Sequence, residues 1–345
     1  MKKILIIRFS SIGDIVLTTP VVRCLKKQTG AAVHYLTKQS FQAVLAANPY
    51  VDKVWTFRQE VTEVLPQLRA EGFDLVIDLH RNLRSLRVRL ALWNVPSHVF
   101  NKLNVEKWLM VNWKINRLPN RHIVDRYLDT VRTLGVVNDG AGLDYFIPAE
   151  EEVDAAGFLQ ERLPPSLPAI PYIAFVTGAA HATKRLPEAK IIAICRLLQQ
   201  PVVLLGGPDE AESGARIAAA AGPHVVNACG ALKLNQSASV VRQASRVISH
   251  DTGLMHIAAA LNKDIVSVWG NTIPAFGMYP YYPNGTNRNT SIEVTGLSCR
   301  PCSKIGFNKC PKGHFKCMQE ISETAVASPT ITNSPITNNQ FPNNQ

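Results

Sequence analysis

Short apolar runs rich in β-branched residues alternate with helical patterns along most of this chain, and this alternation limits the fold more than any other feature. Such alternation predicts parallel strands joined by crossover helices. In the first half the runs lie at Ile4–Phe9, Ala32–Leu36, Lys53–Phe57, Phe73–Leu79 and His98–Phe100. In the second half they lie at Tyr172–Thr177, Val202–Leu205, Val225–Asn227, Arg246–Ser249 and Ile265–Val268. We therefore expect an α/β fold with two doubly wound, Rossmann-like domains that face a central cleft.

The length of 345 residues suits two domains of ordinary size. A proline-rich stretch, Leu163–Pro168, interrupts the alternation and is the natural hinge. We expect an N-terminal domain over 1–162 and a C-terminal domain over 163–323. From about Thr324 the chain is rich in Ser, Thr, Asn, Pro and Gln without periodicity, which predicts a disordered tail over 324–345.

We expect the apolar residues at the N-terminus not to act as a targeting or membrane signal. Lys2 and Lys3 precede the apolar residues Ile4–Ile7, but Arg8 ends this run before the apolar region of a signal peptide is complete. No stretch has the length of a transmembrane helix. We expect a cytoplasmic protein.

A net charge of +11 points to an anionic partner, and the basic residues cluster. Between Arg81 and Arg126 the only acids are Glu106 and Asp125. The basic residues there are Arg81, Arg84, Arg87, Arg89, Lys102, Lys107, Lys114, Arg117, Arg121 and Arg126, and the tryptophans are Trp93, Trp108 and Trp113. This mixture suits an anionic headgroup at a membrane surface, a phosphorylated glycan or nucleic acid. The alternative is an ordinary solvated basic face.

Four of the seven cysteines lie close together near the C-terminus, at Cys299, Cys302, Cys310 and Cys317. They begin with a CxxC pair, but the later spacings match no standard zinc pattern closely. A structural metal site and a reduced, packed loop both remain open. The other three, Cys24, Cys195 and Cys229, lie alone in apolar surroundings typical of core residues.

Asp14 follows the first predicted strand, in the segment Ser10-Ser11-Ile12-Gly13-Asp14. It would therefore lie at the carboxyl edge of a parallel sheet, where open α/β sheets bind ligands. The structural alternative is that Asp14 only caps the next helix.

Two loops of the second half carry groups suited to a phosphorylated ligand. After the strand that ends at Ser249, the chain runs from Asp251 through Thr252 and Gly253 into an apolar helix that contains His256. A helix N-terminus offers free N–H groups to an anion, and glycine permits close approach. The loop 177–187 adds Thr183 and Lys184 beside Arg185, and cations of this kind suit a diphosphate.

A third loop, after the strand ending at Leu205, carries Glu210. A carboxylate after a glycine turn can accept hydrogen bonds from ribose hydroxyls. A cap for Asp251, a core position for His256 and an acidic first helical turn for Glu210 are the structural alternatives. Together, the loops fit a nucleotide-sugar transferase in which Lys184 and the helix terminus stabilise the departing diphosphate without a metal.

In this order the motifs RFSSIGDIVLTTP, TKRLP, DTGLMHIAAAL and CRPC…CPKGHFKCM resemble the bacterial ADP-heptose:lipopolysaccharide heptosyltransferases, glycosyltransferase family 9. The resemblance extends from Met1 to about Met318. It implies a GT-B fold and an inverting, metal-independent transfer of heptose from ADP-heptose to an inner-core sugar of lipopolysaccharide, with no cofactor. The acceptor would be a lipid-linked, anionic glycan, and the protein a monomer in peripheral contact with the inner face of the cytoplasmic membrane, with no nucleic-acid partner.

The resemblance also implies residue roles. Asp14 matches the general base, and Lys184 matches the contact to the donor phosphates. Glu210 matches the carboxylate near the ribose. The loop that binds diphosphate and heptose is matched by Asp251, Thr252, Gly253 and His256, and a basic residue on the acceptor side by Arg84. We also expect Thr183 to bind the donor and Arg81 to bind the acceptor. Two departures stand out: Leu186 lies where many relatives have tryptophan, and the chain soon after Met318 enters its polar tail. The alternatives are another nucleotide sugar, or a non-catalytic basic protein that binds an anionic surface or nucleic acid.

Overall fold

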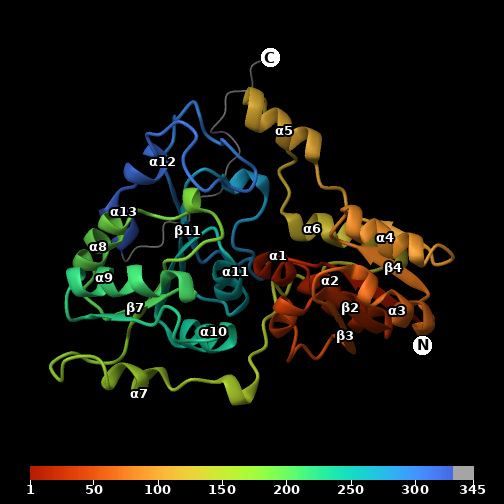
Figure 1. Ribbon diagram of the computed structural model, residues 1–345, viewed down its shortest axis with the longest axis horizontal. Coiled ribbons are helices and arrows are strands. Elements are labelled where there is room, and N and C mark those ends of the chain that lie inside the picture. The colour runs from red at the N-terminus through yellow and green to blue at the C-terminus, as the bar shows by residue number, and fades with distance from the viewer. Residues whose placement is uncertain (329–345) are drawn as a thin grey trace. The chain divides into compact units, whose positions relative to one another are not determined.

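The computed structural model of the protein describes residues 1–328, which divide into two compact units (Figure 1). The first unit consists of Met1–Lys102 and Arg121–Pro148. The second consists, among the described residues, of Leu103–Asn120 and 149–328. Each unit contains one sheet in which every neighbouring pair of strands is parallel, as the alternating pattern predicts.

The sheet of the first unit has the strand order β3-β2-β1-β4-β5. Its strands are β1 (Lys3–Ile7), β2 (Ala32–Lys38), β3 (Lys53–Phe57), β4 (Leu75–Asp78) and β5 (Ser97–Val99). Its helices are α1 (Ile12–Val16), α2 (Thr19–Thr29), α3 (Leu65–Glu71), α4 (Leu83–Ala91) and α6 (Ile123–Leu128). Because β1 pairs with both β2 and β4, the chain order reverses beside β1. In folds of this type the ligand site lies at the carboxyl ends of the strands at such a reversal.

The sheet of the second unit has the order β11-β10-β9-β6-β7-β8, which is the strand order of the dinucleotide-binding fold. Its strands are β6 (Ile173–Val176), β7 (Val202–Leu205), β8 (Val225–Asn227), β9 (Arg246–His250), β10 (Ile265–Trp269) and β11 (Asn289–Glu293). Its helices are α5 (Asn104–Trp113), α7 (Ala155–Gln160), α8 (Glu188–Leu197), α9 (Ala211–Ala221), α10 (Leu234–Gln243), α11 (Gly253–Ala260), α12 (Lys316–Gln319) and α13 (Glu323–Ala327). Here the order reverses between β6 and β9.

Helices cover both faces of this second sheet. Phe175 and Leu204 pack with α8, α9 and α13 in one apolar cluster. The alternate residues Ala174, Val203 and Val247 point to the opposite face and are also fully buried. Helices α8 and α9 lie side by side, and α10 contacts both α7 and α11 (Figure 1). The doubly wound architecture is therefore confirmed.

Residues 103–120 lie within the N-terminal domain predicted as 1–162, but they pack with the second unit. Met110 of α5 is buried against Ile273 and Phe276. The ammonium group of Lys114 donates to the carbonyl oxygens of Val111 and Pro301, both at 2.7 Å. The contacts of α5 thus attach this segment to residues far along the chain.

The segment 149–162 also packs with the second unit, ahead of the proline-rich stretch expected as the hinge. The backbone N–H of Val153 donates to Ser239 Oγ at 3.0 Å, and Gln243 Nε2 donates to the Val153 carbonyl at 2.7 Å. Both partners belong to α10. The observed contacts therefore place the boundary between the two units after Pro148. The composition of the sequence predicts this boundary at 162/163.

The C-terminal tail expected to be disordered over 324–345 begins with a helix. In α13 the side chain of Val326 is fully buried, and Lys190 of α8 forms an ion pair with Glu323 at 2.7 Å. Ser322 caps this helix by accepting from the backbone N–H of Ala325. The rest of the tail, 329–345, lies outside the described residues.

Candidate functional site

Asp14 lies on α1, immediately beyond the carboxyl end of β1, so the turn predicted from the sequence places its carboxylate at the edge where the strand order reverses. One oxygen, Oδ2, accepts from the backbone N–H and the hydroxyl of Ser11, at 3.1 and 2.9 Å. The other oxygen, Oδ1, lies 2.6 Å from a guanidinium nitrogen of Arg8. Asp14 is thus both a helix-terminal residue and a carboxylate held in one orientation.

Arg8 is the buried cation that sets the charge of this carboxylate. It follows β1 directly and donates to the carbonyl oxygen of Leu79, just beyond β4, at 2.6 Å and to the hydroxyl of Tyr127, in α6, at 3.1 Å. Burial alone would raise the pKa of Asp14, but the Arg8 charge and the Ser11 hydrogen bonds outweigh burial and lower it to about 2. With one fifth of its side chain exposed, Asp14 is an accessible, fully ionised carboxylate near neutral pH.

The loop after β4 contributes to the same edge of the first unit. The His80 ring packs on Phe9 with 4.8 Å between ring centroids. Burial, with the nearby charge of Arg8, lowers the pKa of His80 to about 3, so the imidazole is neutral near pH 7. Asp78 orders the loop, because its Oδ1 accepts from the backbone N–H groups of His80 and Arg81, at 3.0 and 2.7 Å.

The two predicted acceptor-side arginines differ in their surroundings. Arg81 bonds the carbonyl oxygen of Phe100 at 3.3 Å and Asn101 Oδ1 at 3.1 Å, so it stays beside the strand ends. Arg84 lies on α4, with its side chain 40% exposed and 3.9 Å from Glu60. Arg81 thus follows β4 in the same loop as His80, whereas Arg84 belongs to a helix surface.

In the second unit, three strand ends meet around one carboxylate oxygen. Asp251 Oδ2 accepts from Lys184 Nζ at 2.6 Å and from Thr272 Oγ1 at 2.9 Å. These residues follow β9, β6 and β10 respectively. The structure therefore brings together Lys184 and Asp251, which the sequence predicts as donor-binding. An ammonium group has three N–H donors, and this one uses one of them on Asp251.

Glu210 lies in the same region and has its own cationic partner. Its carboxylate is 3.0 Å from Arg185 and accepts from the backbone N–H of Gly207 at 2.9 Å. Arg185 also donates to the carbonyl oxygen of Ala179 at 2.7 Å. A Cβ atom at Gly178 would come within 2.9 Å of the Glu210 carboxylate, so a larger residue there would displace this side chain.

Thr183 has a different environment from Lys184, its neighbour in the sequence. It is buried, and its hydroxyl donates to the carbonyl oxygen of Phe307 at 3.1 Å and accepts from that residue's N–H at 2.8 Å. The backbone N–H of Thr183 bonds the same carbonyl. Thr183 therefore ties the Lys184 loop to the cysteine-rich segment that contains Phe307.

The predicted anion turn is present at the N-terminus of α11. Gly253 is the first residue of this helix, Thr252 is its N-cap and His256 is buried one turn later. The Thr252 hydroxyl is buried and has no hydrogen-bond partner among residues 1–328. The end of α11 thus offers a hydroxyl and backbone N–H groups beside Lys184 and Asp251.

Several residues of the two edges were not assigned a role from the sequence: Arg8, His250, Asn271 and Thr272. His250 Nε2 accepts from the backbone N–H of Leu186 at 3.0 Å, and burial lowers its pKa to about 4. Asn271 is 1% exposed, and within the described chain neither polar atom of its side chain has a partner. Because Asn271 and Thr272 follow β10 as Asp251 follows β9, strand position alone is the signal that could have found them.

The cysteine-rich segment is held by buried Arg300 and not by disulfides. Arg300 donates to the carbonyl oxygens of Gly270 and Thr272, at 2.5 and 2.9 Å, and lies 2.5 Å from Glu293. All four cysteines there are free thiols, and burial raises the pKa of Cys317 to about 11. Cys299 Sγ lies 3.8 Å from His314 Nε2. Over 1–328, no three His, Cys, Asp or Glu side chains are placed to hold a metal ion.

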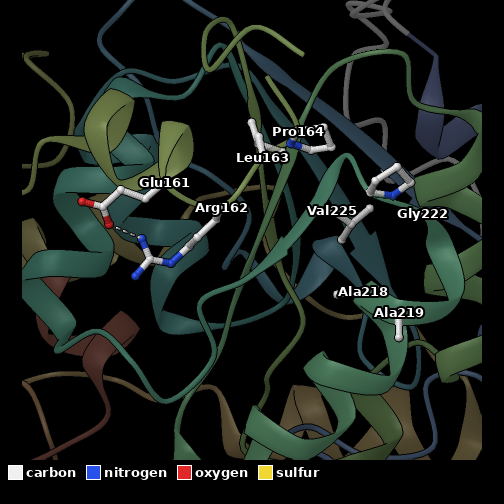
Figure 2. A pocket seen from close by; sticks show the side chains of 9 residues that line it. Glu161, Arg162, Leu163, Pro164, Ala218, Ala219, Gly222 and Val225 are labelled. Carbon is white, nitrogen blue, oxygen red and sulfur yellow. Dashed lines mark hydrogen bonds and ion pairs between the residues drawn. The ribbon is translucent and has the colours of Figure 1, made fainter. Parts of the chain in front are cut away.

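An open hollow of about 500 Å³ lies elsewhere on the second unit (Figure 2). It is lined by Glu161–Pro164 and by residues of α9 and the turn before β8. Because that turn precedes β8, the hollow lies toward the amino ends of the strands, away from Lys184 and Asp251. It contains none of the residues predicted to bind a ligand.

A sequence model described as Glycosyltransferase family 9 (heptosyltransferase) matches residues 61–307. Lipopolysaccharide heptosyltransferase 1 of Pseudomonas aeruginosa is 26% identical over 325 residues, which cover 88% of this chain and 86% of that protein. Among solved structures, glycosyl transferase family 9 from Veillonella parvula has a TM-score of 0.73 at 22% identity and covers 94% of this chain and 95% of its own. The E. coli heptosyltransferase WaaC with ADP has a TM-score of 0.62 at 22% identity, and the match covers 84% of this chain and 92% of that one. These structural likenesses show the GT-B fold expected from the sequence.

Within residues 1–328, no helix is long and apolar enough to cross a bilayer.

Proposed function

The chain belongs to glycosyltransferase family 9, the heptosyltransferases, and from this premise we propose that it transfers heptose from ADP-heptose to an inner-core sugar of lipopolysaccharide. We further propose that transfer inverts the anomeric centre and needs no metal ion. The names of its relatives support the donor and the pathway. The observation that carries the proposal is the convergence of Lys184, Asp251 and Thr272 on one sheet edge, at the N-terminus of a helix.

This edge supplies what a departing nucleoside diphosphate requires. Lys184 would donate to phosphate oxygens with its remaining N–H groups, and the N-terminus of α11 would add backbone donors and the Thr252 hydroxyl. These groups offset the negative charge that grows on the leaving group, which is the task a metal ion performs in other transferases. Glu210 would accept hydrogen bonds from the ribose hydroxyls, with Arg185 fixing its orientation.

In the first unit, Asp14 would act as the general base. The oxygen of the acceptor hydroxyl attacks the anomeric carbon, the bond from that carbon to the phosphate oxygen breaks, and the hydroxyl proton passes to the Asp14 carboxylate. A carboxylate with a pKa of about 2 is a weak base, so proton transfer follows the build-up of positive charge on the attacking oxygen. The Arg8 contact keeps the group ionised and aimed at the strand edge.

The acceptor would be a lipid-linked, anionic glycan, whose charge suits Arg81 and Arg84. Both belong to a stretch without acidic residues between Asp78 and Glu106. A lipid-linked acceptor lies in a membrane, so we propose a cytoplasmic protein that works as a monomer on the inner face of the cytoplasmic membrane. No cofactor takes part in this scheme.

A transfer assay tests the proposal directly. Purified protein is incubated with ADP-heptose and lipid A bearing defined core sugars, with and without EDTA, and products are followed by mass spectrometry and their anomeric configuration by NMR. We expect one added heptose of inverted configuration in both conditions. Loss of transfer in EDTA, restored by a divalent cation, would contradict the metal-independent scheme.

Thermal shift measurements with ADP, UDP, GDP and CMP separate this proposal from transfer of another sugar. We expect ADP to give the largest rise in melting temperature. Stabilisation by UDP alone would assign the donor site to a different nucleotide sugar.

A further inference from the structure

Helix α4 of the first unit carries large apolar side chains that are exposed to solvent. Leu83, Leu86 and Leu90 recur at helical spacing and are 78, 37 and 64% exposed, and Trp93, just beyond the helix, is 83% exposed. The opposite face is the one that packs: Val88 and Leu92 are buried in the core of the unit. Large apolar side chains gathered on one exposed helix face mark an interaction surface. We call these four residues with Arg84 and Arg87 the α4 face.

The charge of the α4 face is wholly positive. Arg84 and Arg87 lie among the leucines with side chains 40 and 60% exposed. Their only acidic neighbour within 4 Å in the described chain is Glu60, at 3.9 and 3.5 Å, distances typical of weak surface pairs. Arg89 does not join them, because it is paired with buried Asp78 at 3.2 Å. An approaching partner therefore meets leucine, tryptophan and two largely available guanidinium groups.

We propose that the α4 face docks onto an anionic lipid bilayer, with its leucines and Trp93 in the interfacial region and Arg84 and Arg87 at the headgroups. A helix of nine residues is too short to span a bilayer but suits one that lies in its surface. Tryptophan is typical of the interfacial region of a bilayer, and arginine pairs with the phosphates of lipid headgroups. The inference extends the proposed function, since a lipid-linked acceptor would be met at this surface, but its test needs no turnover.

Other occupants fit the α4 face less well. A second copy docked through a two-fold axis would bring together two positively charged faces, neither of which carries an acidic residue to pair with the arginines of the other. Nucleic acid would satisfy the arginines but would leave three leucines without apolar contacts. An anionic bilayer, which is charged at its surface and apolar beneath, satisfies both the arginines and the leucines.

Sedimentation of the full-length protein with large vesicles provides the test. Vesicles of phosphatidylcholine alone are compared with vesicles containing about one third phosphatidylglycerol, in low and high salt. We expect binding to the anionic vesicles only, weakened by salt. The double variant Leu83→Gln/Leu90→Gln should bind at least tenfold more weakly, because it removes two apolar side chains from the interface. Arg87→Gln should bind about fivefold more weakly, the contribution of one cation at an anionic surface.

Matched variants on the same unit serve as controls. Val137→Gln changes another apolar residue, which is 65% exposed, and Arg132→Gln changes another exposed cation. Both should bind vesicles as the parent does. Quenching by brominated lipids should fall in Trp93→Phe, which places that residue at the bilayer.

Three outcomes would overturn the proposal. The first is that the parent does not bind the anionic vesicles. The second is that the leucine variant binds them as tightly as the parent. The third is that the leucine variant loses self-association, seen by analytical ultracentrifugation, but keeps vesicle binding. Transfer to a short, soluble acceptor should be equal in parent and leucine variant. Vesicle binding in a protein that transfers no heptose would refute the proposed function and leave this inference standing.

Discussion

Replacing Arg8 by methionine should raise the pKa of Asp14 from about 2 to its ordinary value of 3.8 or higher. Burial favours the neutral acid, and Arg8, 2.6 Å away, is the one charged group bonded to this carboxylate in the described chain. A rise of this size means that the ionised form of Asp14 loses about 2.5 kcal/mol of stabilisation relative to the neutral acid. Methionine fills much of the same volume, so the change removes mainly charge and hydrogen bonds.

The pH dependence of kcat/KM measures this effect on the catalytic group. In the parent, Asp14 stays ionised down to about pH 2, so its titration does not limit activity between pH 4 and 8. In Arg8→Met the acid limb should move up to about pH 4 or above. Arg8→Lys, which keeps a positive charge near the carboxylate, should move the limb less, and Arg132→Met, at an exposed arginine of the same unit, should not move it.

Stability should change with pH in the corresponding direction. When folding lowers the pKa of a carboxyl group, the group stabilises the native state at pH values above the pKa that it has in the unfolded chain. This stabilisation is lost as the pH falls toward the pKa that the group has in the folded protein. The excess stability of the parent over Arg8→Met should therefore shrink between about pH 4 and pH 2. Identical acid limbs in parent and variant, with a stability difference that does not depend on pH, would refute the assignment of Arg8 as the group that keeps Asp14 ionised.

Three further substitutions test the donor edge. Lys184→Ala should weaken ADP binding about 10- to 100-fold, since it removes a charge-assisted phosphate contact, and unchanged affinity by calorimetry would remove that role. Glu210→Gln should weaken binding of ADP but not of inorganic pyrophosphate, and equal losses for both would contradict a ribose contact. Asn271→Leu should leave the melting temperature equal or higher, because no hydrogen bond of the described chain is lost, and it should lower donor affinity about tenfold. A large drop in melting temperature with unchanged donor affinity would show that Asn271 has a structural role instead.

The strands were predictable because parallel strands are buried on both faces and appear as short apolar runs. All ten predicted runs contain or overlap an observed strand. The observed strand β11 was missed; it has the polar sequence Asn289-Thr290-Ser291-Ile292-Glu293, and within residues 1–328 it pairs only with β10. An edge strand of this kind lacks the apolar signal on which the prediction depends.

The packing of α5 could not be predicted, because its partners are remote in the sequence. Nothing local in residues 104–113 indicates that Met110 is buried against Ile273 and Phe276. The helix α13 was missed for a similar reason: a polar composition predicts disorder, but one buried valine and the Lys190–Glu323 ion pair hold the helix on α8.

Position after a strand was enough to predict that Lys184 and Asp251 belong to one edge, because the carboxyl ends of parallel strands meet there. The same rule applied after β10 would have found Asn271 and Thr272. It could not reveal that Thr183 bonds the backbone of Phe307, since that contact depends on how a distant loop folds back. Arg8, which ends the first apolar run, gave no local sign that it would be buried against Asp14.

The catalytic role of Asp14 is best tested by comparing Asp14→Asn with the parent in heptose transfer and in donor binding. Asparagine keeps an oxygen for the Ser11 hydrogen bonds but cannot take the proton of the acceptor hydroxyl. We predict that kcat falls by about 10² to 10⁴, the usual contribution of a general base, while the Kd for ADP stays within about twofold of the parent. Transfer at the parental rate by a correctly folded Asp14→Asn protein would contradict the role of Asp14 as the catalytic base.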